Sequence, residues 1–339
     1  MGPFMRAAVL TEPNTPLELT DLPDPTPAPG QVVVAVRASG LCWSDVLAQR
    51  GQWPVRLPVV PGHEPVGEIV ALGEGVTTLR VGDRVGVSWN QKGCGRCEWC
   101  LRRRPVYCAA YQSWMDLGGG HAELMVAWAD GCTLLPDAIP FEHAAPVLCA
   151  GFTVMSGLRN ADPRPGDRVA VLGIGGLGHL AVQYAAALGL ETVVLTSSAD
   201  KAAAAGRLGA ADAIVVDGDP GQALARAGGA DIVLATTTSA QQMSKVLSGL
   251  RPEGRLVTMG VPDGPLVVED TGTLLFKQCS IKGSTHNDRA DLVEALDLVA
   301  AGRVTPIVET YPLDQVHDAF ARVESGKVRY RGVLQMSGD

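Results

Sequence analysis

The sequence feature that most constrains the fold is an uncharged stretch of 22 residues, from Val169 to Leu190. It opens with the apolar run Val169–Leu172, continues through a glycine-rich hexad, and ends in an apolar segment of helical length. Five glycines and two polar side chains argue against a membrane-spanning helix: Gly173, Gly175, Gly176, Gly178, Gly189, His179 and Gln183. The stretch therefore predicts a buried strand, a tight turn and a helix.

The hexad has the pattern G-x-G-x-x-G, and it stands between an expected strand and an expected helix. Glycines in this place allow a tight turn and let backbone amides approach a pyrophosphate, which the dipole at the helix N-terminus also favours. The pattern predicts a dinucleotide-binding turn. Its candidate cofactor-binding residues are Gly173, Gly175, Gly176, Leu177 and Gly178.

From about residue 150 onward, apolar strand patterns alternate with helical patterns. The expected strands are 168–172, 192–196, 213–216, 232–235 and 255–259, and the expected helices are 177–188, 201–208, 222–227, 241–250 and 291–301. This alternation predicts an α/β fold with a doubly wound parallel sheet.

The end of the second strand of this sheet bears on the choice of cofactor. NAD-specific sites usually have an Asp or Glu there, about 20 residues after the glycines, to bind the ribose hydroxyls. Here the strand ends in Thr196, Ser197 and Ser198, followed by Lys201, and Asp200 comes slightly late. Hydroxyls and a lysine suit a 2′-phosphate. We therefore expect a preference for NADP, with NAD as the alternative.

The first half of the chain is of a different kind, with short strands expected at 31–38, 67–72 and 84–87 and a proline-rich connector at 23–30. A net charge of −8 makes nucleic acid and anionic membranes improbable partners, because both require a basic surface. No basic-then-apolar leader opens the sequence. We expect a cytoplasmic protein with a small-molecule substrate.

Four cysteines lie within 15 residues: Cys94, Cys97, Cys100 and Cys108, spaced C-x2-C-x2-C-x7-C. In a long chain without secretory features, such a cluster indicates metal binding rather than disulfides. Four thiolates on one short lobe would complete a tetrahedral zinc shell and stabilise a segment too small for its own core. An iron–sulfur cluster is the alternative.

Cys42, His63, Glu64 and Cys149 are scattered, and taken singly each is unremarkable. A lone cysteine is usually a small core residue. Spacing alone does not assemble them into a site.

In combination, however, the motifs resemble the zinc-dependent alcohol dehydrogenase family of the medium-chain dehydrogenase/reductase superfamily. The resemblance runs from Met5 to about Met336. It is carried by Cys42 before Ser44-Asp45, the Gly62-His63-Glu64-x-x-Gly67 signature, the four-cysteine lobe, Cys149 and the glycine-rich turn, all in family order. The hydroxyl-rich end of the second strand resembles the cinnamyl alcohol dehydrogenase branch, and Trp89 resembles yeast-type alcohol dehydrogenases.

The resemblance implies two zinc ions per chain. Cys42, His63 and Cys149 would hold a catalytic zinc with an open fourth position, and Glu64 would be a possible transient ligand. By the same resemblance Asp45 would orient His63, Ser44 would start proton transfer, and Arg331 would bind the cofactor pyrophosphate.

The implied architecture is a GroES-like catalytic domain at 1–151 and 288–339, with the zinc lobe at about 90–110, and a Rossmann domain at 152–287. Catalysis would lie in the cleft between them. The implied assembly is a homodimer or homotetramer.

The sequence also departs from the family. Leu47 occupies the position where many relatives have a relay histidine, and Trp43 replaces a residue that is often His, Gly or Arg. Trp43, Trp53, Trp89 and Trp114 fall where the family builds its substrate pocket, which favours an apolar or aromatic substrate; ordinary surface packing is the alternative.

We therefore expect NADP-linked interconversion of alcohol and aldehyde, mainly aldehyde reduction. The alternatives are an NAD-linked secondary-alcohol or polyol dehydrogenase, an NADPH-dependent reductase of imines or activated alkenes, and a non-enzymatic zinc-stapled nucleotide sensor.

Overall fold

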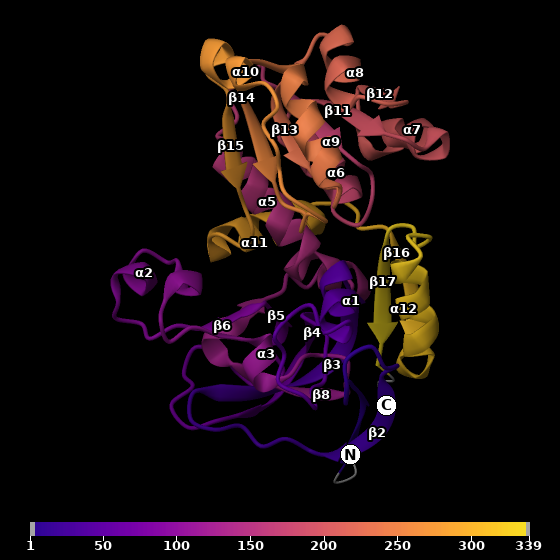
Figure 1. The fold of residues 1–339 in the computed structure, drawn as a ribbon. Helices are drawn as coiled ribbons and strands as arrows, with labels where there is room; N and C mark the ends of the chain where they lie inside the picture. Colours follow the sequence, from indigo (N-terminus) through magenta and orange to yellow (C-terminus); the bar gives the residue numbers. More distant parts are fainter. Residues whose placement is uncertain (1–3, 337–339) are drawn as a thin grey trace. The chain divides into compact units, whose positions relative to one another are not determined.

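The computed structural model describes residues 4–336. The chain divides into two compact units, Met1–Cys149 with Pro306–Asp339 and Ala150–Thr305, whose course can be followed by colour in Figure 1. The two units are described separately.

The first unit is built on a seven-stranded sheet in the order β16-β17-β3-β4-β5-β9, with β8 also paired to β3. Two small two-stranded sheets, β1-β2 and β6-β7, accompany it. The strands are β1 Phe4–Val9, β2 Glu18–Pro23, β3 Gln31–Leu41, β4 Glu64–Leu72, β5 Arg84–Val87, β6 Asn90–Lys92, β7 Gln112–Ser113, β8 Leu124–Trp128, β9 Cys132–Leu134, β16 Val308–Pro312 and β17 Arg331–Gln335.

Strand β3 organises this unit because it pairs with β17, β4 and β8. Its alternating residues are buried on both faces, Val32, Val34 and Val36 in the main core and Val33 and Ala35 in a smaller cluster. The strand runs three residues beyond the predicted 31–38 because Ser39, Gly40 and Leu41 pair with β17.

The helices of this unit are short: α1 Trp43–Gln49, α2 Glu98–Leu101, α3 Trp114–Leu117, α4 Phe141–Ala144 and α12 Val316–Glu324, with 3-10 turns η1 Pro105–Tyr107, η2 Ala129–Gly131, η3 Ala145–Leu148 and η6 Leu313–Gln315. The sequence analysis did not identify α12. It is amphipathic, and Val316, Ala319 and Phe320 bury its apolar stripe in the main core.

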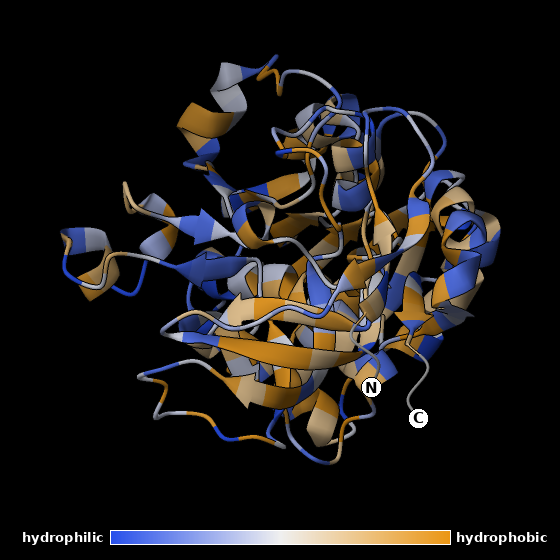
Figure 2. Cartoon of the chain, turned by 90° about the horizontal axis from the view of Figure 1, so that it is seen from below, coloured by the Kyte–Doolittle hydropathy of each residue, from blue (hydrophilic) through white to orange (hydrophobic). Residues whose placement is uncertain are grey.

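The cysteine-rich lobe that contains α2 projects from the rest of the first unit, at the left of both views (Figures 1 and 2). Hydrophobic and hydrophilic colours are mixed over it in Figure 2, whereas the sheet strands are mostly hydrophobic. Trp99, Leu101 and Tyr107 of the lobe are exposed. The lobe therefore lacks a hydrophobic core of its own.

The second unit has a six-stranded parallel sheet in the order β12-β11-β10-β13-β14-β15. Its strands are β10 Arg168–Leu172, β11 Glu191–Thr196, β12 Asp212–Val215, β13 Ala230–Ala235, β14 Leu250–Thr258 and β15 Ser280–Gly283. The order reverses between β10 and β13, as in a Rossmann fold. The predicted α/β doubly wound class is thereby confirmed.

The helices of this unit are α5 Ala150–Ala161, α6 Gly178–Ala187, α7 Ala199–Ala205, α8 Pro220–Arg226, α9 Ala240–Lys245, α10 Thr271–Lys277 and α11 Arg289–Ala300, with 3-10 turns η4 Gly206–Leu208 and η5 Val246–Gly249. Helices α5, α6 and α11 pack together, and α8 packs on α9. Because right-handed crossovers leave β10 and β13 in opposite directions along the sheet, these two groups cover opposite faces.

The second unit extends further along the chain than the predicted boundary at residue 288, since residues 288–305 belong to it. Asp288 caps α11, and Leu292, Ala295 and Leu296 bury one face of this helix, which packs against α5 and α6. The apolar face of α11 thus keeps it with this unit, and the chain returns to the first unit only at Pro306.

The uncharged stretch 169–190 forms β10, the glycine turn and α6, as predicted. Among residues 4–336, no helix is both long and apolar enough to span a membrane.

Candidate metal centres

Four residues from distant parts of the first unit converge on one buried point. The metal-ligating atoms of Cys42, His63, Glu64 and Cys149 all lie within 4.8 Å of one another, and the two cysteine sulfurs are 3.9 Å apart. None of the four residues is more than 9% exposed. The structure therefore brings together the residues that spacing alone could not assemble.

Pairing of β3 with β4 sets this geometry. Gly40 is the register partner of Glu64, so Cys42, just beyond β3, lies next to His63, just before β4. A Cβ atom on Gly40 would lie 2.0 Å from Glu64 Oε2. Glycine at position 40 thus leaves the space that the Glu64 carboxyl fills.

The position of His63 is fixed by Asp45, in the first turn of α1. His63 Nδ1 lies 3.0 Å from Asp45 Oδ1, and Asp45 Oδ2 accepts a hydrogen bond of 2.8 Å from the Cys42 backbone N–H. The other ring nitrogen, Nε2, is buried without a hydrogen-bond partner among residues 4–336. One carboxylate thus orients the imidazole and anchors the loop carrying Cys42.

The two thiols are electrostatically unequal. The pKa of Cys42 lies well below its usual value because the Cys149 thiol donates a hydrogen bond to it, with further help from His63 and Arg331. The same contact with Cys42, together with burial, raises the pKa of Cys149. This environment favours a thiolate at Cys42, and thiolate is the form that binds metals.

Glu64 pairs with Arg331, whose guanidinium is itself buried. Burial raises the pKa of Glu64 to about 7 in spite of this cation. Glu64 Oε2 has no hydrogen-bond partner within the described part of the chain. In the structure Arg331 thus contacts the metal-ligand cluster; pyrophosphate binding by this residue stays a prediction.

These observations match the requirements of a zinc ion. Two sulfurs and an unpartnered imidazole nitrogen form the donor set of a three-ligand site with one open position. Asp45 supplies the carboxylate that commonly holds a zinc-ligating histidine.

The second cluster lies in the projecting lobe. The sulfurs of Cys94, Cys97, Cys100 and Cys108 also lie within 4.8 Å of one another. Gly93 packs tightly behind them, since a Cβ there would lie 2.6 Å from Cys100 Sγ. Four cysteines with no other ligand type fit a closed structural site.

Backbone amides point at the sulfurs of this lobe. The N–H groups of Cys97 and Ala110 donate to Cys94 Sγ and Cys108 Sγ, each at 3.3 Å. Hydrogen bonds from the backbone of Arg96 and Cys97 lower the pKa of Cys94 to about 6. These amides stabilise negative charge on Cys94, whereas desolvation raises the pKa of Cys100 to about 11.

Two of the four predicted pocket tryptophans contact the His63 ring, and a third packs against one of these two. Trp89 meets the His63 ring edge-on at 4.9 Å between centroids, and Trp114 stacks on it at 6.1 Å. Trp53 meets Trp89 at 4.9 Å. Trp43 instead lies beneath the Arg50 guanidinium. The structure thus builds an aromatic wall beside the metal-ligand cluster from Trp53, Trp89 and Trp114.

In the second unit the glycine hexad forms the turn between β10 and α6. Gly173 has a φ of +95°, and a Cβ on Gly178 would lie 2.0 Å from the Gly173 carbonyl oxygen. A Cβ on Gly175 would meet no atom within 4 Å. The first and last glycines are required by the turn itself, while the middle one leaves open space of the kind a phosphate needs.

The hydroxyls at the end of β11 have different surroundings. Ser198 caps α7, accepting a hydrogen bond of 3.3 Å from Lys201 N, and Thr196 Oγ1 accepts one of 3.2 Å from Ser198 N. Ser197 is exposed. Of the three hydroxyl residues, Ser197 is the one most accessible to a ligand.

Two supporting residues were missed by the sequence analysis. His121 packs against Gly62, where a Cβ would lie 2.4 Å from its Nδ1, and this nitrogen is 3.0 Å from Ser39 Oγ. Thr236, at the end of β13, donates to the Gly173 carbonyl at 2.7 Å. Neither had a signal in the sequence, because each acts through contacts distant along the chain.

Comparisons with known proteins identify the family of the chain. Residues 28–137 match the family described as "Alcohol dehydrogenase GroES-like domain", and residues 176–301 match "Zinc-binding dehydrogenase". An alcohol dehydrogenase of Moraxella sp. is 42% identical over 335 residues, covering 97% of this chain and 99% of the relative. One from Geobacillus stearothermophilus is 38% identical, covering 99% and 100%.

Among solved structures, a cinnamyl alcohol dehydrogenase from Sorghum bicolor superposes with a TM-score of 0.89 at 31% identity, covering 98% of this chain and 97% of that one. The resemblance found in the sequence is thus confirmed, and so is an oxidoreductase of the alcohol dehydrogenase type. The chain belongs to the zinc-dependent alcohol dehydrogenase family of the medium-chain dehydrogenase/reductase superfamily.

Proposed function

We propose that this alcohol dehydrogenase prefers NADP(H), holds two zinc ions per chain, and works mainly as a reductase of apolar or aromatic aldehydes. The observation that carries the proposal is the buried convergence of Cys42, His63 and Cys149 beside an aromatic wall. Cys94, Cys97, Cys100 and Cys108 would hold the second, structural zinc.

Each residue at the buried centre has a separate role. Cys42, Cys149 and His63 Nε2 would hold the catalytic ion, and Asp45 keeps the imidazole oriented through its other nitrogen. Zinc bound there would supply Lewis-acid stabilisation of charge on the substrate oxygen. Glu64, kept in place by Arg331, lies close enough to serve as a transient ligand.

Proton transfer would begin at Ser44. Its Oγ lies 3.8 Å from Cys42 Sγ and is thus next to the expected position of the substrate oxygen. Leu47 is 8% exposed and apolar, so no proton relay passes through this position. In aldehyde reduction the proton would therefore reach the substrate oxygen from water through the cofactor ribose and Ser44, and in alcohol oxidation it would leave by the same route.

The glycine turn would bind the cofactor pyrophosphate and Arg331 would assist, while Thr196, Ser197, Ser198 and Lys201 would receive the 2′-phosphate. NADPH supplies the hydride. The lack of a carboxylate at positions 196–198 supports NADP, since a carboxylate would repel the phosphate.

The substrate class follows from the aromatic wall. Trp89 contacts Trp53, Trp114 and the His63 ring, and Trp114 also stacks on that ring, so an apolar or aromatic substituent would pack against indole rings there.

The decisive experiment measures initial rates on aliphatic and aromatic aldehydes, ketones and cyclic imines, with NADPH and with NADH. We expect the highest kcat/KM for aromatic aldehydes with NADPH. Ser197→Asp should raise KM for NADPH at least tenfold and leave KM for NADH nearly unchanged, while Ser197→Asn serves as the uncharged control. A wild-type preference for NADH would overturn the NADP proposal and favour an NAD-linked secondary-alcohol or polyol dehydrogenase.

Inactivity on every carbonyl by protein that carries two zinc ions would overturn the aldehyde reductase proposal. The buried Leu47 would then favour an imine or activated-alkene reductase, which the cyclic imines in the same panel test directly.

We also propose a homodimer or homotetramer. In the second unit β15 is an edge strand, and Leu275 and Phe276 of the preceding helix α10 are 70% and 85% exposed. An apolar surface next to an unpaired strand edge is suited to association. Light scattering should show that Phe276→Asp lowers the molecular mass of the assembly; an unchanged mass would exclude this surface.

A further inference from the structure

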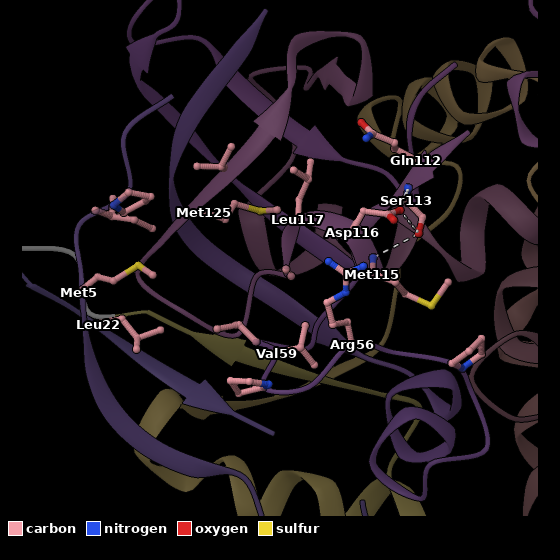
Figure 3. Close-up of a pocket in the computed structure, with 18 residues that line it drawn as sticks. Met5, Leu22, Arg56, Val59, Gln112, Ser113, Met115, Asp116, Leu117 and Met125 are labelled. Atoms are coloured by element: carbon pink, nitrogen blue, oxygen red, sulfur yellow. Dashed lines mark hydrogen bonds between the residues drawn. The ribbon is translucent and has the colours of Figure 1, made fainter. Parts of the chain in front are cut away.

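The first unit contains a cavity that lies apart from the four-residue metal cluster. It has a volume of about 690 Å³, is partly open to solvent, and is lined by β1, β2, the segment 54–60, the segment 112–119 that includes α3, and β8 (Figure 3). The cavity is not lined by any of the four cluster residues, which are Cys42, His63, Glu64 and Cys149. Its size is that of a small-molecule site.

Part of the wall is apolar and includes methionine side chains. Met5, Leu22, Val59, Leu117 and Met125 contribute side chains from five separate segments, and Figure 3 shows them around the same space. Methionine side chains adapt to ligands of irregular shape. This part of the cavity fits an aliphatic or aromatic group.

The polar part of the wall has two side chains without internal partners. Arg56 is an exposed residue at the cavity, and its guanidinium makes no hydrogen bond or ion pair within residues 4–336. Gln112 Oε1 is buried without a hydrogen-bond partner in the same part of the chain. By contrast, Asp116 is already engaged, because its Oδ2 accepts hydrogen bonds of 2.7 and 3.2 Å from Ser113 N and Oγ. The available groups are therefore a cation and an amide.

We propose that this cavity binds an amphipathic carboxylate, with an apolar chain against the methionine and leucine side chains and the carboxylate on Arg56. Arginine forms two parallel hydrogen bonds with a carboxylate, which a point charge cannot do. Burial of each further CH2 group should tighten binding by about fourfold.

The cavity shares two of its segments with the aromatic wall. Trp114 opens α3 between the lining residues Ser113 and Met115, and Trp53 directly precedes the lining segment. A carboxylate bound here would touch the supports of both indoles without contacting the metal ligands. The site is therefore placed to influence the aromatic wall.

Calorimetric titration of the zinc-loaded protein with hexanoate, octanoate and decanoate tests the proposal. We expect one site per chain, tighter binding for each longer acid, and no comparable binding of octylamine. Arg56→Glu should weaken octanoate binding at least tenfold, while Arg80→Glu, at an exposed arginine outside the cavity, should leave it unchanged.

Octanoate could also bind at the candidate catalytic metal, and a second titration separates the two sites. In Cys42→Ser the cavity is intact, so octanoate affinity should persist there and should still depend on Arg56. Loss of binding in Cys42→Ser, or equal affinity in wild type and Arg56→Glu, would overturn the proposal. Because this measurement needs no turnover, it is independent of the proposed substrate and cofactor.

Discussion

The two candidate metal centres present cysteine ligands in opposite surroundings. Cys42 and Cys149, separated by 107 residues, meet in the core of the first unit, where Asp45 and Arg331 support the cluster. The four lobe cysteines come from one 15-residue segment. The large apolar side chains near them, Trp99, Leu101 and Tyr107, are exposed and form no core.

This difference separates two uses of a metal. A core that is already folded can hold three ligands around an open coordination position, because packing rather than the ion fixes the geometry. A short projecting segment has little packing, so its conformation depends on the ion itself. Loss of the metal should therefore abolish catalysis at the buried centre, whereas in the lobe it should cause the loss of a defined conformation.

The largest expected effect is on turnover. Cys42→Ser removes a ligand from the buried centre, and the lost stabilisation of charge on the substrate oxygen should lower kcat/KM by about a thousandfold or more. Metal analysis should show one zinc per chain remaining, and binding of NADPH should be almost unchanged.

The matched control is Cys132→Ser, at a thiol that is equally buried and lies outside both clusters. It should retain near-normal rates. Near-normal rates in Cys42→Ser itself would remove the catalytic role of this centre.

A smaller loss is expected from Asp45→Asn. Asparagine has one acceptor oxygen for the two donors that Asp45 serves, the Cys42 N–H and His63 Nδ1, and it supplies no charge, so zinc affinity or kcat should fall about 10- to 100-fold. Competition with a chelator measures the affinity at the buried centre, and the lobe metal in the same sample is the internal standard. Equal weakening at both centres would contradict a specific role for Asp45.

At the lobe, Cys97→Ser should release one metal and loosen residues 94–108. We expect limited proteolysis within this segment to become at least tenfold faster, while kcat changes less than threefold. Hydrogen exchange should show the loss of protection confined to the lobe. A loss of activity as large as that of Cys42→Ser would show that the two centres do not have separate roles.

The smallest expected effect is on the pH dependence of the free energy of unfolding, and it comes from His121. Burial lowers the pKa of His121 to about 4, whereas the unfolded chain has a pKa near 6.5. Between these values the unfolded state binds the extra proton, so the free energy of unfolding falls as pH falls below 6.5. From pH 7.5 to 5.5 this residue alone should cost about 1 kcal/mol.

Urea denaturation of wild type and His121→Gln, both with excess zinc, isolates this contribution. The variant should lose less stability than wild type over the same pH range. An identical pH dependence in the two proteins would contradict a neutral, buried His121.

Several features could be predicted from residues that are neighbours in the sequence. The glycine hexad between Val169–Leu172 and an apolar helix predicts the β10–turn–α6 unit because strand, turn and helix are adjacent in sequence. The Cys94–Cys108 spacing predicts a cluster for the same reason. The end of the second unit was harder to place, since it depends on which neighbours the apolar face of α11 finds.

The sequence by itself therefore determined the Rossmann topology, the lobe and, through family resemblance, the candidate ligands. Only the tertiary structure decided that Cys42, His63 and Cys149 meet and that Arg331 contacts Glu64. It also decided which tryptophans lie at the cluster: Trp89 and Trp114 contact His63, and Trp53 packs on Trp89, whereas Trp43 lies beneath Arg50. The physical reason is the separation along the chain of the residues that come into contact. Backbone turns and nearby ligand spacings are encoded within a few residues, whereas these contacts are created by the β3–β4 pairing and by side chains packing across more than 100 residues.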